Sequence, residues 1–110
     1  MNYEDFQKLA LSFPGVEEAV AYGTPIFKVK GKMMARLTDE PDIVVVKTDP
    51  ALRSSLVGAA DAFFVTPHYE PHPLMLVDLK KAAAEDLEYL LERAWRAVAS
   101  KKSIADFDKV

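Results

Sequence analysis

Residues 26–38 decide the fold of this chain, and they read Ile26-Phe27-Lys28-Val29-Lys30-Gly31-Lys32-Met33-Met34-Ala35-Arg36-Leu37-Thr38. Before the glycine, Phe27 and Val29 share one face of an extended chain and the lysines share the other. Lys30-Gly31-Lys32 predicts a tight hairpin turn. Beyond it, alternation predicts Met33, Ala35 and Leu37 on one side of a second strand, with Arg36 on the other. Strands joined by so short a turn pair antiparallel, because parallel pairing needs a long crossover.

Further strands and helices are predicted on both sides of this hairpin. Strands are expected at residues 16–22, 43–48, 62–65 and 74–79, and the second of these is β-branched almost throughout. The first helix should begin after the N-cap Asn2 and stop at Pro14-Gly15. A second should begin at Asp49-Pro50 and end at Gly58. A third, at residues 84–99, has apolar side chains at helical spacing.

This element order predicts an α+β fold. The elements follow the order α-β-β-β-β-α-β-β-α. The strands should form a single antiparallel sheet, with helices packed on one face and the other face partly open. The 110 residues fit one domain, 1–110, in which residues 101–110 form a polar tail with one turn around residues 104–107.

Composition restricts the function classes. The chain has no cysteine and a net charge of −3, which excludes thiolate metal sites and argues against a broad nucleic-acid surface. The polar, acidic N-terminus is unlike a signal peptide, and the longest aliphatic runs are too short to cross a membrane. We therefore expect a cytoplasmic protein with no membrane partner.

Basic residues gather in the opening stretch. Residues 26–36 contain Lys28, Lys30, Lys32 and Arg36 and no acidic residue. Such a hairpin can lie along DNA and contact its phosphates at low affinity, and Lys101 and Lys102 could add to it if the tail folds back. The alternative is a solvated strand face on which lysines discourage edge-to-edge pairing.

A loop rich in histidine and proline is the second candidate site. Residues 64–77 contain both histidines, His68 and His72, with Tyr69 between them. This loop and the open sheet face could bind a protein or small molecule; alternatively, the rings satisfy loop backbone. Two imidazoles are too few for a closed zinc site, although Glu70 lies between them and could contribute, so a metal site at His68, Glu70 and His72 is a third and weaker option. Since there is also no nucleophile motif or glycine-rich phosphate loop, we expect no catalytic residues, no cofactor and no enzyme.

Several motifs resemble the MmcQ/YjbR-like family. The residues that carry the resemblance are Phe64-Val65-Thr66-Pro67-His68-Tyr69, Pro73-Leu74-Met75-Leu76-Val77, Leu11-Ser12-Phe13-Pro14-Gly15-Val16-Glu17-Glu18, Gly23-Thr24-Pro25-Ile26-Phe27-Lys28-Val29-Lys30-Gly31-Lys32, and Ala94-Trp95-Arg96 with Val98-Ala99-Ser100-Lys101-Lys102. They occur in collinear order over nearly the whole chain. The resemblance implies a CyaY-like fold and DNA binding through a double wing, of which the basic hairpin would be one wing and the His/Pro loop the other.

Overall fold

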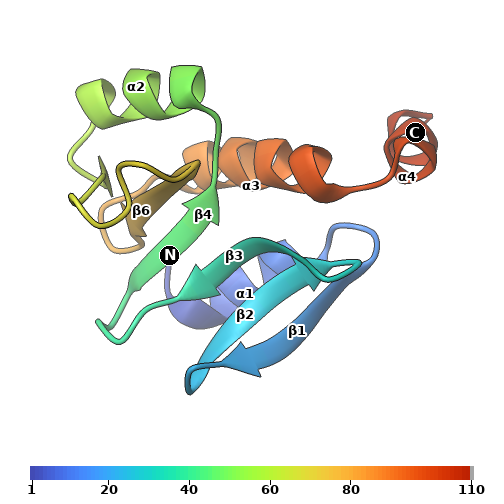
Figure 1. Cartoon of the computed structure of the whole chain (residues 1–110), viewed down its shortest axis with the longest axis horizontal. Coiled ribbons are helices and arrows are strands. Elements are labelled where there is room, and N and C mark those ends of the chain that lie inside the picture. Colours follow the sequence, from blue (N-terminus) through green and yellow to red (C-terminus); the bar gives the residue numbers. More distant parts are fainter. Residues whose placement is uncertain (110) are drawn as a thin grey trace.

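A computed structural model describes residues 1–109 and shows one six-stranded antiparallel sheet with helices on one of its faces (Figure 1). The elements are α1 (Tyr3–Leu11), β1 (Val16–Ala21), β2 (Thr24–Val29), β3 (Lys32–Leu37), β4 (Ile43–Lys47), α2 (Pro50–Ala59), β5 (Phe63–Phe64), β6 (Leu74–Asp78), α3 (Ala84–Val98) and α4 (Lys101–Asp108). The strand order is β1-β2-β3-β4-β6-β5, so β6 enters the sheet between β4 and β5. The predicted α+β class and single antiparallel sheet are confirmed.

Two-residue turns connect the first three strands. Tyr22-Gly23 joins β1 to β2, and Lys30-Gly31 joins β2 to β3. All four residues have positive φ, from 50° to 81°. That conformation follows the right-handed twist of a hairpin, and glycine adopts it without a steric penalty.

Helices α1 and α3 cover the rear face of the sheet in Figure 1. Asn2 caps α1, and its side chain accepts a hydrogen bond from the backbone N–H of Asp5. The longer α3 buries one stripe of side chains, namely Leu87, Leu90, Leu91, Ala94, Trp95 and Val98. The indole N–H of Trp95 donates to the carbonyl of Pro14 at 2.8 Å, which ties α3 to the turn after α1.

Helix α2 begins as predicted but ends later. The Asp49 side chain accepts a hydrogen bond from the N–H of Leu52 at 2.8 Å, and Pro50 occupies the first turn. The expected stop at Gly58 is wrong, because Gly58 keeps a negative φ within the helix. The helix ends after Ala59, where Ala60 adopts an extended conformation.

A β-bulge in β3 overturns the predicted alternation of that strand. Lys28 pairs with Met33 and Phe27 pairs with Ala35, which leaves Met34 as the extra residue. Met34 and Ala35 are consequently both fully buried against the helices, and Met33 lies on the opposite face. The bulge places Arg36 on the same face as Met33 and Lys28.

The predicted polar tail is wrong, because residues 101–108 form α4. Ser100 caps this helix by accepting a hydrogen bond from the N–H of Ser103 at 3.1 Å. Phe107 packs against Trp95 and Phe13, with ring centroids 4.9 Å and 6.1 Å away. This aromatic contact gives the segment a buried side, so it folds back onto the domain; Val110 lies outside the described residues.

Within residues 1–109, no helix combines the length and the apolar character that crossing a membrane requires.

Candidate functional site

A row of side chains crosses the sheet on the face opposite α1 and α3. Paired positions on neighbouring strands place Ile26, Arg36, Val45, Leu76 and Phe64 side by side, and we call them the open-face row. Ile26, Val45 and Leu76 are at most 7% exposed even though α1 and α3 lie on the other side. Another part of the chain must therefore cover this face.

Residues 65–73 are that part, and Arg36 attaches them to the sheet. The Arg36 guanidinium donates a hydrogen bond to the Tyr69 hydroxyl and lies 5.8 Å from the centre of the Tyr69 ring. It also donates to the carbonyl of Leu37 at 3.2 Å. Two of the residues predicted for separate surfaces, Arg36 and Tyr69, are thus direct partners.

Arg53 of α2 holds the same segment from its other side. Its guanidinium donates to the carbonyls of His72 at 2.7 Å, Glu70 at 3.0 Å and Leu74 at 3.3 Å. Two loop carbonyls and the first carbonyl of β6 therefore share one cationic donor. The segment is fixed to the domain and does not project from it as a second wing.

The histidines do not form a metal centre in this arrangement. His68 packs edge-on against Tyr69 with ring centroids 4.9 Å apart, and its ring lies 6.4 Å from that of His72. In residues 1–109, no three histidine or acidic side chains are positioned to hold a metal ion together. His68 and His72 are exposed, whereas Tyr69 is half-buried.

The predicted phosphate-binding residues separate into two groups. Lys28 and Arg36 belong to the open face, and Lys28 lies directly across from Glu17 of β1. Lys32 lies across from Val29, whose side chain faces the helices, so Lys32 and Lys28 leave the sheet on opposite sides.

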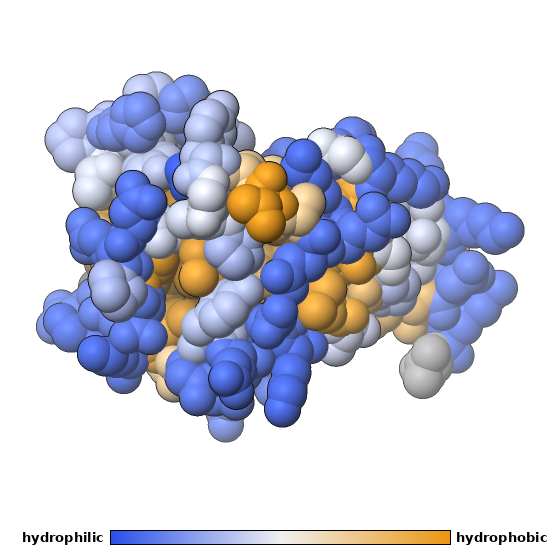
Figure 2. Space-filling model, turned by 90° about the horizontal axis from the view of Figure 1, so that it is seen from below, coloured by the Kyte–Doolittle hydropathy of each residue, from blue (hydrophilic) through white to orange (hydrophobic). Residues whose placement is uncertain are grey.

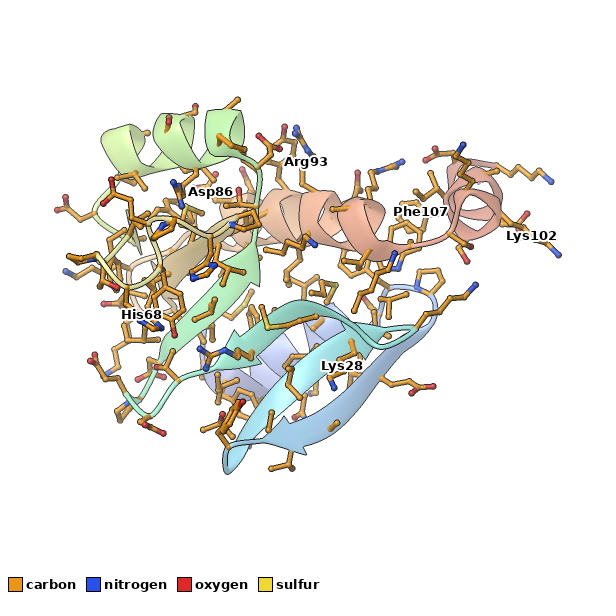
Figure 3. All side chains as sticks on the ribbon, in the orientation of Figure 1. Lys28, His68, Asp86, Arg93, Lys102 and Phe107 are labelled. Carbon is orange, nitrogen blue, oxygen red and sulfur yellow. The ribbon has the colours of Figure 1, made fainter. Side chains whose placement is uncertain are left out.

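The second group lies at one end of the molecule. The β2–β3 turn, which contains Lys30 and is followed directly by Lys32, is at the end of the domain that carries α4, with Lys101 and Lys102 in its first turn (Figure 1). We call Lys30, Lys32, Lys101 and Lys102 the lysine cluster. All four are exposed, and none has an ion-pair partner within residues 1–109. In Figure 3, Lys102 points away from the domain and His68 lies at the opposite end.

An ion pair supports the aromatic contact that positions α4. Arg96 donates two hydrogen bonds to the Asp108 carboxylate, at 2.6 Å and 3.1 Å, and its guanidinium lies 5.5 Å from the Phe107 ring centre. Hydrogen bonding to Arg96 lowers the pKa of Asp108 below its usual value. Hydrogen bonds to Asp108 and, to a smaller extent, to Glu92 raise the pKa of Arg96. At neutral pH both partners are charged, and Asp108 holds the end of α4 against α3.

A hollow of about 280 Å³ lies beside the open-face row, and the sequence did not reveal it. Its floor consists of Ile43, Phe64 and Leu76, from three neighbouring strands. The residues around the floor are Thr38, Asp39, Glu40, Thr66 and Tyr69. Only the strand order β4-β6-β5 brings these segments together. Tyr69, predicted as a ligand-contact residue, does line it, whereas His68 and His72 do not.

The family is established by comparison with known sequences. The family model described as YjbR matches residues 11–97, which include the sheet, the loop and most of α3. The chain belongs to the YjbR family. This confirms the family resemblance of its motifs. An uncharacterised protein of Mycobacterium tuberculosis, Rv2570, is 31% identical over 93 residues, covering 80% of this chain and 72% of its own length. The uncharacterised Mycobacterium bovis protein Mb2600 matches this YjbR-family chain equally well.

Solved structures share the fold of this YjbR-family chain. A Pseudomonas syringae protein has a TM-score of 0.76 and 18% identity, covering 90% of this chain and 100% of its own. Deinococcus radiodurans protein DR2400, a DUF419 domain, has a TM-score of 0.77 and 24% identity, covering 92% and 80%. At such identities the likeness shows the fold alone.

Proposed function

We propose that this YjbR-family domain is a binding protein, not an enzyme, that contacts the phosphate backbone of DNA through the lysine cluster. The observation that carries the proposal is the position of α4. Because Phe107 packs against Phe13 and Trp95, Lys101 and Lys102 lie at the end of the domain where β2 turns into β3 at Lys30 and Lys32.

The charged environment of each residue supports the lysine cluster as the phosphate-binding surface, in place of the complete basic hairpin of residues 26–36. Arg36 is engaged by Tyr69, and Lys28 faces the carboxylate-bearing strand β1, so both are less available to a phosphate. The lysine cluster combines four exposed ammonium groups without an ion-pair partner in the described residues. Viewed from below in Figure 2, this end of the molecule shows mostly hydrophilic side chains. Backbone contacts of this kind bind without reading the base sequence.

The test is a fluorescence-polarisation titration with labelled duplex and single-stranded DNA at several salt concentrations. Four phosphate contacts on duplex DNA predict a slope of log K against log salt of about −3 to −4. Lys30→Glu/Lys32→Glu and Lys101→Glu/Lys102→Glu should each weaken binding strongly at low salt. The absence of any low-salt binding would refute the proposal.

Lys8→Glu/Lys81→Glu is the matched control. Both lysines are exposed and have no ion-pair partner in residues 1–109, and neither belongs to α4 or to the β2–β3 hairpin. The double substitution changes the net charge by the same amount as each test pair. Binding should therefore fall much less in the control, and an equal loss in all three variants would show a general effect of net charge.

A further inference from the structure

We infer that the hollow beside the open-face row binds a small organic cation with an apolar body, such as an aromatic or branched aliphatic amine. This site lies away from the lysine cluster and is independent of DNA binding. The sequence predicted either a protein or a small molecule as the partner of the His/Pro loop and the open sheet face, and this inference favours the small molecule.

The floor of the hollow supplies the apolar contact. Phe64 and Ile43 are only half-buried although they lie in the sheet, and Leu76 between them is 6% exposed. Side chains of this kind would normally be covered by another element. With about 280 Å³ available, the hollow is near the lower limit for ligand pockets, so the ligand should be about the size of one aromatic ring with a short chain.

The charge of the ligand follows from the rim. Asp39 and Glu40 are exposed, and neither has an ion-pair partner within residues 1–109. The adjacent Asp42 differs, because it pairs with Lys80 at 3.4 Å. Two free carboxylates beside an apolar floor favour an ammonium group and disfavour an anion.

An aromatic ring reinforces this preference. Phe64 lies in the floor, and the face of an aromatic ring attracts a cation. The Tyr69 ring in the wall already has the Arg36 guanidinium 5.8 Å from its centre, and Arg36 also donates to the Tyr69 hydroxyl and to the Leu37 carbonyl. The ligand's ammonium should therefore lie toward Asp39 and Glu40 and away from Arg36.

The rim is already ordered without a ligand. The Thr38 hydroxyl donates to the carbonyl of Ile43 at 2.9 Å and accepts from the N–H of Glu40 at 3.2 Å. On the other side, the N–H groups of Tyr69 and Glu70 both donate to the carbonyl of Thr66 at 3.0 Å. Little conformational entropy is lost when a ligand enters a site whose walls are fixed in this way.

The experiment compares three probes that share a phenyl ring and differ in charge. These are 2-phenylethylammonium, neutral 2-phenylethanol and anionic 3-phenylpropionate, each titrated into the ¹⁵N-labelled protein and followed by amide chemical shifts. The cation should bind most tightly, and its shifts should concentrate at the amides of residues 38–40, 42 and 43, and at Phe64, Thr66 and Leu76. Equal binding of the cation and the alcohol, shifts located elsewhere, or no shifts at all would overturn the inference.

Charge removal tests the rim directly. Asp39→Asn/Glu40→Gln should weaken binding of the cation about fivefold and leave the alcohol unchanged, since exposed charge pairs have effects of this size. Asp61→Asn/Glu88→Gln removes two exposed carboxylates that do not line the hollow and is the matched control. An unchanged cation affinity in the rim variant, or an equal loss in the control, contradicts the assignment. Both variants raise the net charge equally and leave the lysine cluster in place, so any change in DNA binding should be the same in the two. This inference and the DNA proposal can therefore fail separately.

Discussion

The lysine cluster depends on contacts between segments from the two ends of the chain, whereas the hollow depends on the pairing of neighbouring strands. Lys101 and Lys102 are positioned because Phe107 packs against Trp95 of the preceding helix and reaches Phe13 across most of the sequence. The floor of the hollow follows from sheet hydrogen bonding between β4, β6 and β5. The comparison teaches that undocking of α4 is enough to disperse the lysine cluster, whereas the floor of the hollow persists as long as the sheet does.

Phe107→Ala should separate the two surfaces most strongly. Truncation removes the ring that packs against Phe13 and Trp95, and Phe107 is partly buried, so we expect a loss of about 2 kcal/mol in the free energy of unfolding. DNA affinity should fall with it, because α4 is no longer held in place. Urea unfolding followed by Trp95 fluorescence measures the first effect.

Tyr22→Ala is the control for aromatic truncation. Tyr22 is fully exposed at the β1–β2 turn, so its removal should change stability by less than about 0.5 kcal/mol. If Phe107→Ala were as mild as this control, the docking of α4 would not be what positions Lys101 and Lys102.

Arg53→Gln should act on the other region, with a smaller effect. The substitution removes the charged donor shared by the carbonyls of Glu70, His72 and Leu74, and we expect destabilisation of about 1 kcal/mol. Amide hydrogen exchange should speed up in residues 65–73 and stay unchanged in α4. Faster exchange in α4 would contradict the independence of the two regions.

Acid should produce the smallest effect, and at the α4 end that effect should come from Asp108. Because pairing with Arg96 lowers the pKa of Asp108 in the folded protein, this pair stabilises the fold above the carboxylate's ordinary pKa of about 4. That contribution is lost as the pH falls below about 4 and through the lowered pKa of Asp108. Trp95 fluorescence should report a loosening of α4 in this range.

Asp108→Asn sharpens the acid experiment. The variant should already lack the pair at neutral pH, so its Trp95 signal should show no corresponding step on acidification. An identical acid transition in both proteins would assign it to other carboxylates, such as Asp49, whose pKa is lowered first by the N–H of Leu52.

Local sequence patterns predicted the sheet and the first three helices because hairpin turns, caps and periodicity are local signals. The predicted N-caps are Asn2 and Asp49, and both cap their helices; the predicted turn forms at Lys30-Gly31. The bulge could not be seen, since Met33-Met34-Ala35 is apolar throughout and any of the three could face inward. Helix α4 was missed because Phe107 acquires its buried side only from Phe13 and Trp95.

The site was less accessible to sequence reasoning than the fold. Charge alone identified the four lysines of the lysine cluster as candidate phosphate-binding residues, but their common location depends on tertiary packing. The partnership of Arg36 with Tyr69 joins residues far apart in the sequence, and nothing local indicates it. The hollow could not be found without the strand order, because β6 enters the sheet before β5 in space although it follows β5 in the chain.

The strand order has a consequence for how the chain folds. Strands β1 to β4 follow one another as neighbours, so their pairing closes only short loops and should form early. Strand β6 must instead find β4 across α2, β5 and the loop, whereas its pairing with β5 closes only the shorter loop of residues 65–73. We therefore expect the rate-limiting step of folding to be the arrival of β6, with the hollow among the last parts of the molecule to form.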